Sequence, residues 1–518
     1  MGLVWSTAAV DPHPASAYLA FASATELASE LASGSTTSVD LVAGLLGRID
    51  AVDRPGPPHS GPPHSDQLEL RSLLALARDA LDIAAARDAE RRAGQVRGPL
   101  HGIPILVKDN IETVGLPGSA GSLALAGRPV ARDAPVVATL RDAGAIVLGA
   151  TNLSEWANIR SERSTSGWSA LGGLTANPWS LGHSAGGSSS GSGAAIAAGL
   201  APLALGTETD GSITCPASLN GCAGLKPTVG MLSRAGIVPV THDQDSPGPL
   251  ARNVVDLATM LDAMTATNRH AAVRAGHDPA FTVAAVARGW SSGHAATDDC
   301  FERVIERLGS AGMTVVDVEV ADPAEVIEDE FAAILHALGD DLTGYLAARP
   351  GTGVRSLADV VDFNRSHAET ELEHFGQDLF ERALALGGRG APGYTAARGR
   401  ALHWARSCLD AALPPEGAGA VLLAPTYAPA WPADLAHGDP HDDLGGASTH
   451  AAAIAGWPIL TIPMGFVTGL PVGLAVIGRP FTEPRLLAIG AAIEAVIGLA
   501  GTSASQPSWR SRNAPDSA

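Results

Sequence analysis

Lysine is almost missing from this sequence of 518 residues. Only Lys108 and Lys226 occur, although lysine and arginine together number 34. Arginine can replace lysine at most surface positions, but it stays protonated, whereas a buried lysine can lose its proton and act as a base. Unless they survive by chance, both lysines are therefore candidates for chemistry or for a tight packing role.

Positive charge and cysteine are also scarce. The formal net charge is −20 at pH 7, and non-specific binding to nucleic acid depends on clustered lysine and arginine. We therefore expect no nucleic-acid partner. The few cysteines are too scattered to form a disulfide framework, so we expect mostly buried thiols at Cys215, Cys222, Cys300 and Cys408.

Long apolar runs are absent as well. The most apolar stretch, residues 451–478, is interrupted by Pro458, Pro463 and Pro471, a pattern typical of short buried strands with turns and not of a membrane span. The first twenty residues lack a basic segment followed by an apolar core, so the sequence predicts no signal peptide, no membrane association and a cytoplasmic location.

The residues that are abundant indicate a folded α/β protein. Hydrophobic residues make up 46% of the sequence and charged residues 17%, as in compact globular proteins. Between residues 100 and 264, apolar runs such as IPILV and AIVLGA alternate with helical patterns such as APVVATLRDAG. This alternation predicts strands joined by crossover helices.

Helices are expected before this region. Ser38 is the expected N-cap of one helix, and residues 72–92 are expected to form an alanine-rich helix. The connector between them contains His59 and His64, but its proline and glycine content favours a surface loop over a metal site.

After this region, strands and helices are expected to alternate again. Strands are expected at residues 281–287, 313–320, 420–425, 458–464 and 472–478, with a helix over residues 483–498 and a disordered tail over residues 506–518.

Two glycine-rich patterns suggest chemistry but carry weak signals. Gly182–Gly186 and Gly187–Gly191 both match the G-x-S-x-G nucleophile elbow, but no apolar strand is expected directly before them. The loop Ser188–Gly193 could hold an anion at a helix start, but it lacks the lysine of a phosphate-binding loop.

A third pattern, GTETDGSI at residues 206–213, follows an expected short strand. Ser212 comes directly after Gly211, so it can lie in a tight turn whose backbone N–H groups converge on one point. Such a turn can serve as an oxyanion hole, in which each main donor contributes about 3–4 kcal/mol to catalysis.

Taken together, VKDN, GGSSSGSG and GTETDGSI resemble the amidase-signature family. In that family the nucleophile follows the relay serine by 24 residues, which is the separation of Ser188 and Ser212 here. GATNLSEWAN, PASLNGCAGLKPTVG and GWPILTIPMG also fit. The resemblance is close over residues 100–264 and looser over about the last hundred residues.

The resemblance implies roles for individual residues. Lys108 would be the neutral base, Ser188 a bridging serine in a cis peptide, and Ser212 the nucleophile, with an acyl-enzyme as intermediate. The oxyanion donors would be the backbone N–H groups of Thr209, Asp210, Gly211 and Ser212. The position of Lys226 is usually interpreted as structural.

Some residues depart from the common family pattern. Asp210 stands where many relatives have glycine and Thr214 where they have arginine, which resembles the branch of the bacterial peptide amidase. His183 and Ala185 also differ from the frequent residues before Ser188. The Asp210 carboxylate could orient substrate, but we favour a local hydrogen bond. A nitrilase-like role for Cys215 or Cys222 finds no support around either residue.

The implied fold is a single α/β/α domain with a large mixed β-sheet core covered by helices. The domain would span residues 16–505, with outer layers formed by N-terminal helices and by a variable insert. We expect N-terminal helices over residues 16–97, a signature core over 98–268, the insert over 269–415, and C-terminal core strands and a helix over 416–498.

The implied function is hydrolysis of a carboxamide, first of all a peptide C-terminal amide, by a monomer or homodimer without metal or organic cofactor. Two alternatives remain: transfer of the same acyl group to an amine, and a non-catalytic binding protein on this fold. The insert and the loops around Trp156, Trp168 and Trp179 are expected to line the pocket, although each tryptophan could equally be a core residue.

Overall fold

The structure is a computed structural model that describes residues 19–53, 69–128, 130–269, 273, 276, 278–351, 353–413, 419–440, 445–500 and 507. Its centre is a mixed sheet of eleven strands in the order β1-β3-β2-β8-β10-β9-β14-β15-β13-β11-β12. In chain order these are β1 (Leu73–Leu76), β2 (Pro104–Lys108), β3 (Ile146–Thr151), β8 (Leu203–Glu208), β9 (Ala223–Lys226), β10 (Ser246–Ala251), β11 (Val283–Val286), β12 (Thr314–Asp317), β13 (Ala420–Pro425), β14 (Ile459–Val467) and β15 (Leu470–Ile477).

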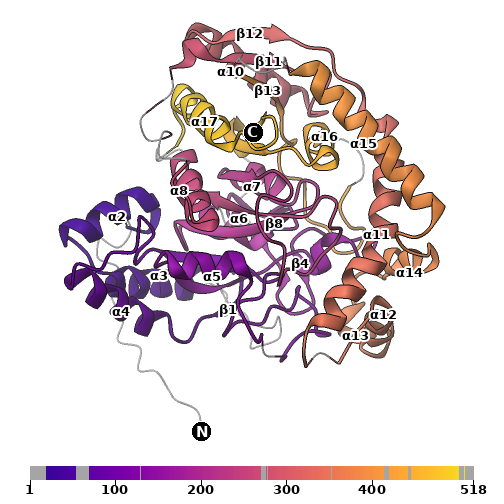
Figure 1. Cartoon of the computed structure of the whole chain (residues 1–518), viewed down its shortest axis with the longest axis horizontal. Coiled ribbons are helices and arrows are strands. Elements are labelled where there is room, and N and C mark those ends of the chain that lie inside the picture. Colours follow the sequence, from indigo (N-terminus) through magenta and orange to yellow (C-terminus); the bar gives the residue numbers. More distant parts are fainter. Residues whose placement is uncertain are drawn as a thin grey trace.

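Helices surround this sheet, and two small hairpins lie outside it (Figure 1). The hairpins pair β4 (Trp168–Ser169) with β5 (Gly173–Leu174) and β6 (Ala176–Asn177) with β7 (Ser180–Ser184). The longer helices are α2 (Ala24–Ser33), α3 (Ser38–Val52), α4 (Ala80–Arg92), α5 (Pro135–Asp142), α6 (Ser190–Ala197), α7 (Thr214–Asn220), α8 (Val254–Thr265), α10 (Ala295–Ser310), α11 (Ile327–Ala348), α12 (Leu357–Ser366), α14 (Asp378–Ala385), α15 (Pro392–Ala412), α16 (Ala447–Ala455) and α17 (Glu483–Ile497).

The two faces of the sheet pack against different helices. On β2, Ile105 and Val107 belong to the core formed with α5, α8, α10 and α17. Leu106, between them, belongs to the core formed with α3, α4, α6 and α7. This alternation follows from the two-residue period of a strand, and because both faces are covered, every residue of β2 is buried. The expected single α/β/α architecture is confirmed.

The parallel pairing of β2 and β8 positions the loops that matter for function. Val107 pairs with Leu205 in parallel register, so both strands end at the same edge of the sheet. Lys108 is the last residue of β2, and Glu208 is the last residue of β8. Loops at the carboxyl ends of adjacent strands are the usual place for a ligand site in α/β proteins.

The N-terminal region differs from the expectation in two places. Residues 73–76 form β1, not the start of a helix, because they pair antiparallel with β3 and the Asp53 carboxylate holds the backbone N–H groups of Ser72 and Leu73. The N-cap of α3 is Thr37, whose side chain accepts a hydrogen bond from the backbone of Asp40, so the helix begins one residue earlier than expected.

Both outer segments also contribute strands to the central sheet. β1 forms one edge, and β11 and β12, from residues 283–317, form the other. The N-terminal region and the insert thus belong to the central sheet as well as to the outer layers expected of them. Within the insert, helices α11, α12, α14 and α15 lie together on the side of the molecule away from α2–α4 (Figure 1), whereas α10 packs against β14.

Some expectations concern residues outside those described. These expectations concern the connector that contains His59 and His64 and the tail over residues 506–518, of which only Pro507 is described. Among the described residues, no helix is both long and apolar enough to span a bilayer.

Candidate active site

Lys108 lies fully buried at the end of β2 among hydroxyl groups. Its Nζ is 2.7 Å from Ser188 Oγ, 3.0 Å from Ser189 Oγ and 2.9 Å from Thr207 Oγ1. Burial lowers the pKa of this amine well below its usual value, against the weaker opposing effect of the Asp245 and Glu208 charges. A neutral amine this close to a serine hydroxyl can accept its proton.

Ser188 and Ser212 line one cavity of about 620 Å³. The peptide bond between Gly187 and Ser188 is cis, as the resemblance implies. The backbone N–H of Ser189 donates to the carbonyl oxygen of Ser212 at 3.0 Å, which fixes the two serine loops to each other. The structure thus brings the three predicted residues, far apart in sequence, to the same end of the sheet.

The turn that carries Ser212 is closed by Glu208. One oxygen of this buried carboxylate accepts hydrogen bonds from the backbone N–H groups of Ile213 and Thr214 and from the Thr214 hydroxyl. A carboxylate at the first N–H groups of a helix is a favourable cap, here for α7. Thr214 therefore contributes a hydroxyl to the turn at the position where many relatives have arginine.

Gly211 occupies a backbone conformation and a space that only glycine fits. Its φ is +76°, and an added Cβ would lie 2.2 Å from the Tyr427 hydroxyl. Thr209, at the start of the turn, is held through its hydroxyl, which donates to Asp245 at 2.6 Å. The backbone of the turn is thus constrained at both ends of the predicted oxyanion hole.

Replacing Gly211 with alanine should lower kcat by about 100-fold, because displacement of one oxyanion donor has a cost of that order. Gly230→Ala is the matched control, since Gly230 also has a positive φ of +89° but no atom within 4 Å of an added Cβ. In this control, a thermal melt should show a loss of stability comparable to that of Gly211→Ala. Steady-state kinetics should show that the control keeps its kcat. Adding Tyr427→Phe to Gly211→Ala should recover part of kcat, and no recovery would contradict the steric explanation.

The Asp210 side chain lies in the same cavity and forms an ion pair. Its Oδ2 is 2.5 Å from His450 Nδ1, and the same nitrogen is 3.1 Å from Glu330 Oε2. Asp210 thus has a partner, which comes from α16 and not from the turn itself. These three side chains are also the one group among the described residues whose spacing could hold a metal ion, with ligand atoms within 4.8 Å of one another.

The remaining lining of the cavity is mixed. Apolar and aromatic side chains come from Ile159, Phe331, Leu379, Tyr427 and Trp431, and acidic ones from Glu162 and Asp439. The insert contributes Phe331 and Leu379, and the loop after Trp156 contributes residues 157–159, as expected. Trp156 and Trp168 themselves are buried core residues, at 3% exposure each, and Trp179 packs against Phe466.

The other candidates from the sequence have structural environments. Lys226 is fully buried and donates to the carbonyl oxygen of Trp457 at 2.6 Å, which fits the packing role. Burial raises the pKa of Cys215 and of Cys222 to about 12, so neither is a thiolate nucleophile at neutral pH. A short strand, β7, does precede Ser184, but it belongs to a hairpin outside the main sheet.

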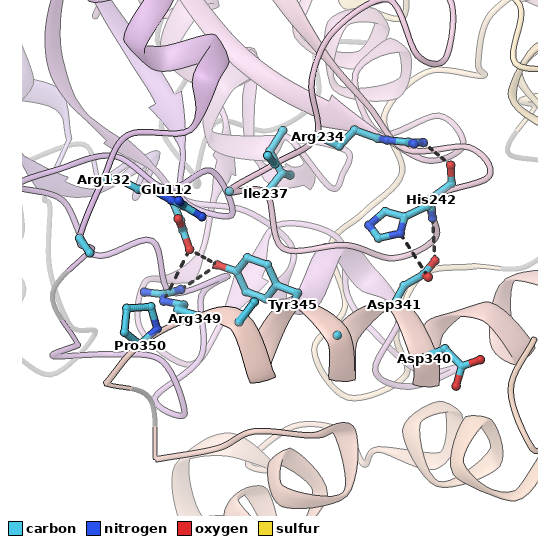
Figure 2. A pocket seen from close by; sticks show the side chains of 15 residues that line it. Glu112, Arg132, Arg234, Ile237, His242, Asp340, Asp341, Tyr345, Arg349 and Pro350 are labelled. Carbon is cyan, nitrogen blue, oxygen red and sulfur yellow. Dashed lines mark hydrogen bonds and ion pairs between the residues drawn. The ribbon is translucent and has the colours of Figure 1, made fainter.

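A second, larger cavity of about 900 Å³ lies between α11 and residues 234–242. Figure 2 shows its charged lining, with Arg349 and Tyr345 next to Glu112 at one end and His242 next to Asp341 at the other. Lys108, Ser188 and Ser212 are not among the residues that line it. Although this cavity is the larger of the two, it lacks the candidate catalytic residues and is therefore not the candidate active site.

Sequence reasoning missed several residues around the candidate site. Glu208 lies inside the motif GTETDGSI at the end of an expected strand, and this position could have indicated that it lies near Ser212. Glu330 and His450 lie 120 residues apart, and no spacing pattern joins them to Asp210. Only the packing of α11 and α16 near the end of β8 reveals them.

Comparisons with known proteins identify the family of this chain. The family model described as Amidase matches residues 66–487. A probable amidase of Arabidopsis thaliana is 35% identical over 82% of this chain and 83% of its own length. A second relative, from Methanosarcina acetivorans, is the A subunit of a glutamyl-tRNA(Gln) amidotransferase, which is 34% identical over 82% of this chain and 89% of its own length.

A solved structure is similar in both sequence and fold. The peptide amidase of Stenotrophomonas maltophilia is 42% identical, with a TM-score of 0.82 over 91% of this chain and 96% of that one. The matched regions contain β2, β8 and the loops that carry Lys108, Ser188 and Ser212. The chain therefore belongs to the amidase-signature family and is an amidase.

Proposed function

We propose that this protein hydrolyses the C-terminal amide of peptides, with Ser212 as nucleophile, Ser188 as proton relay and Lys108 as base. The observation that carries the proposal is the cavity in which Ser188 and Ser212 lie together, with Ser188 Oγ 2.7 Å from the buried Lys108 amine. The similarity to a peptide amidase supports the choice of substrate class.

In the first half-reaction, Ser212 Oγ attacks the carbonyl carbon of the amide. Its proton passes to Ser188 Oγ, and the proton of Ser188 passes to the neutral amine of Lys108. As the tetrahedral intermediate collapses, the carbon–nitrogen bond breaks and the same relay returns a proton to the leaving nitrogen. Ammonia departs, and the acyl group remains bound as an ester to Ser212.

In the second half-reaction, water attacks the ester carbon and gives a proton to the same relay. The carbon–oxygen bond to Ser212 breaks, and the relay returns a proton to Ser212 Oγ. The products are a peptide carboxylic acid and the free enzyme. In both halves, the backbone N–H groups of Thr209, Asp210, Gly211 and Ser212 would stabilise the negative charge on the carbonyl oxygen.

The cavity suits a peptide better than a small carboxamide. Its volume of about 620 Å³ lies in the range typical of sites that bury a drug-sized ligand, and its aromatic residues can pack against side chains next to the amide. Glu162 and Asp439 add negative charge to the lining. A neutral amide end is favoured there over a carboxylate, so the product acid should leave readily.

The proposal is tested by measuring ammonia release from peptide amides and from simple aliphatic or aromatic carboxamides, and amino-acid release from matched peptide acids extended by one residue. Peptide amides should give the highest kcat/KM, and Ser212→Ala should abolish the release. Faster turnover of simple carboxamides would overturn the substrate class. Adding an amine acceptor should leave the acid as the main product, whereas a new amide as the main product would overturn hydrolysis.

A further inference from the structure

Asp210 places a negative charge beside the proposed oxyanion hole. It precedes Ser212 by two residues, and its side chain lines the same cavity. One of its oxygens, Oδ1, is buried and has no hydrogen-bond partner among the described residues. A carboxylate in this position repels the negative charge that develops on the substrate oxygen, and this repulsion is strong where water is excluded.

His450 has the position to offset this charge. Its Nδ1 lies 2.5 Å from Asp210 Oδ2 and 3.1 Å from Glu330 Oε2. Ionised carboxylates only accept hydrogen bonds, so this nitrogen must carry the proton. Burial favours the neutral imidazole, but the charge of Asp210 and the two hydrogen bonds outweigh it and raise the pKa of His450 well above its usual value.

Glu330 holds His450 from the other side. It is only 4% exposed, and its second oxygen accepts a hydrogen bond from the Gln244 side chain at 2.7 Å. Burial, followed by the charge of Asp210, raises the pKa of Glu330. The pKa of Asp210 is lower than usual, because the effects of His450 outweigh that of burial. These shifts favour the charged forms of both Asp210 and His450.

Three separate parts of the chain meet here: the turn after β8, helix α11 of the insert and helix α16 of the C-terminal core. We infer that His450 is a positioning residue whose imidazolium neutralises Asp210, so that the adjacent backbone N–H groups can stabilise an oxyanion. This inference rests on the function proposed above. It also explains how an amidase can keep an aspartate where many relatives have glycine.

The test is a double-mutant cycle on kcat with a peptide amide. His450→Gln keeps a hydrogen-bond donor but loses the charge, and Asp210→Asn removes the charge that needs to be offset while keeping the backbone N–H. His450→Gln alone should lower kcat by at least about 10-fold, with a smaller effect on KM. In the Asp210→Asn background, His450→Gln should lower log kcat by less than about a third of the decrease that it causes in the wild-type background.

The inference is overturned if His450→Gln lowers kcat equally in both backgrounds, or if it leaves kcat unchanged. Activity that EDTA abolishes and a divalent cation restores would also overturn it, because the three side chains would then be metal ligands. A wild type that turns over no amide would contradict the proposed function instead, and the charge state of His450 would remain testable separately.

That separate test measures ¹⁵N chemical shifts of the histidine side chains in the wild type, and the Asp210→Asn variant serves only to assign the signal of His450. His450, identified by the signal that changes in Asp210→Asn, should be an imidazolium at pH 7, above the ordinary pKa of histidine, and a neutral imidazole at that pH would overturn the inference. Besides Asp210 and Glu330, the titratable or charged groups within electrostatic reach of the cluster are Glu208, Lys226, Arg398 and Tyr427.

Discussion

Replacing Ser212 with alanine should lower kcat for ammonia release by about 10⁴- to 10⁶-fold, the loss seen when the nucleophile of a serine hydrolase is removed. Without its hydroxyl, no acyl-enzyme can form, and only binding and the oxyanion donors remain. Mass spectrometry should detect the acyl-enzyme, or a covalent adduct with a serine-directed reagent, on the wild type and not on the variant.

Ser218→Ala is the matched control. Ser218 lies on α7, six residues after Ser212, and its hydroxyl is buried without a hydrogen-bond partner among the described residues. Removing a buried unpaired hydroxyl leaves no partner unsatisfied, so this variant should keep its kcat and its melting temperature. If Ser212→Ala retained more than about a hundredth of the wild-type kcat, well above the residual expected from binding and the oxyanion hole alone, Ser212 would not be the nucleophile.

Replacing Lys108 with arginine should lower kcat by about 10²- to 10⁴-fold, the usual contribution of a general base. Arginine keeps a cation but cannot give up its proton in a protein, so it cannot accept the proton of Ser188. Lys108→Met, which removes the amine but keeps a long unbranched side chain, should lower kcat by as much. Melting temperatures of both variants separate loss of the base from loss of folding.

If the arginine variant were active while the methionine variant was not, a positive charge and not a base would be required at this position. The proposed roles of Lys108 and Ser188 would then be wrong, even with Ser212 as nucleophile. Lys108 is well suited to this comparison because, among the described residues, the hydrogen bonds of its Nζ all go to neutral oxygens, those of Ser188, Ser189 and Thr207.

The pH dependence of the wild type should follow from the same lysine. Lys108 acts as a base only when it is neutral, and burial lowers its pKa well below the usual value. As the pH falls through this lowered pKa, the amine is protonated and kcat/KM should fall about tenfold per pH unit. A pH–rate profile whose acid limb lies near the ordinary pKa of lysine would contradict a buried neutral base.

The sequence alone predicted the family and its candidate residues because the family motifs lie within short segments. VKDN, GGSSSGSG and GTETDGSI each place a candidate group next to glycine or at the end of an apolar run. The scarcity of lysine independently singled out Lys108 and Lys226, and the structure separates them: Lys108 contacts the serine hydroxyls, and Lys226 contacts backbone carbonyl oxygens.

Elements with a strong period were predicted correctly, among them β2, β3, α5 and α17. β1 was missed because its four residues lie directly before an alanine-rich helix, and only pairing with β3 selects the extended conformation. The strands β11 and β12 were expected. Their membership of the central sheet depends on parallel pairing of β11 with β13 and of β12 with β11, which no local pattern contains.

The sequence by itself therefore determined the family, the α/β class and the candidate residues Lys108, Ser188 and Ser212, because each depends on local patterns and their spacing. The tertiary structure alone decided which charges meet at the turn after β8. Asp210, Glu330 and His450 come from segments far apart in the chain, and long-range packing, which local sequence does not encode, brings their side chains into contact.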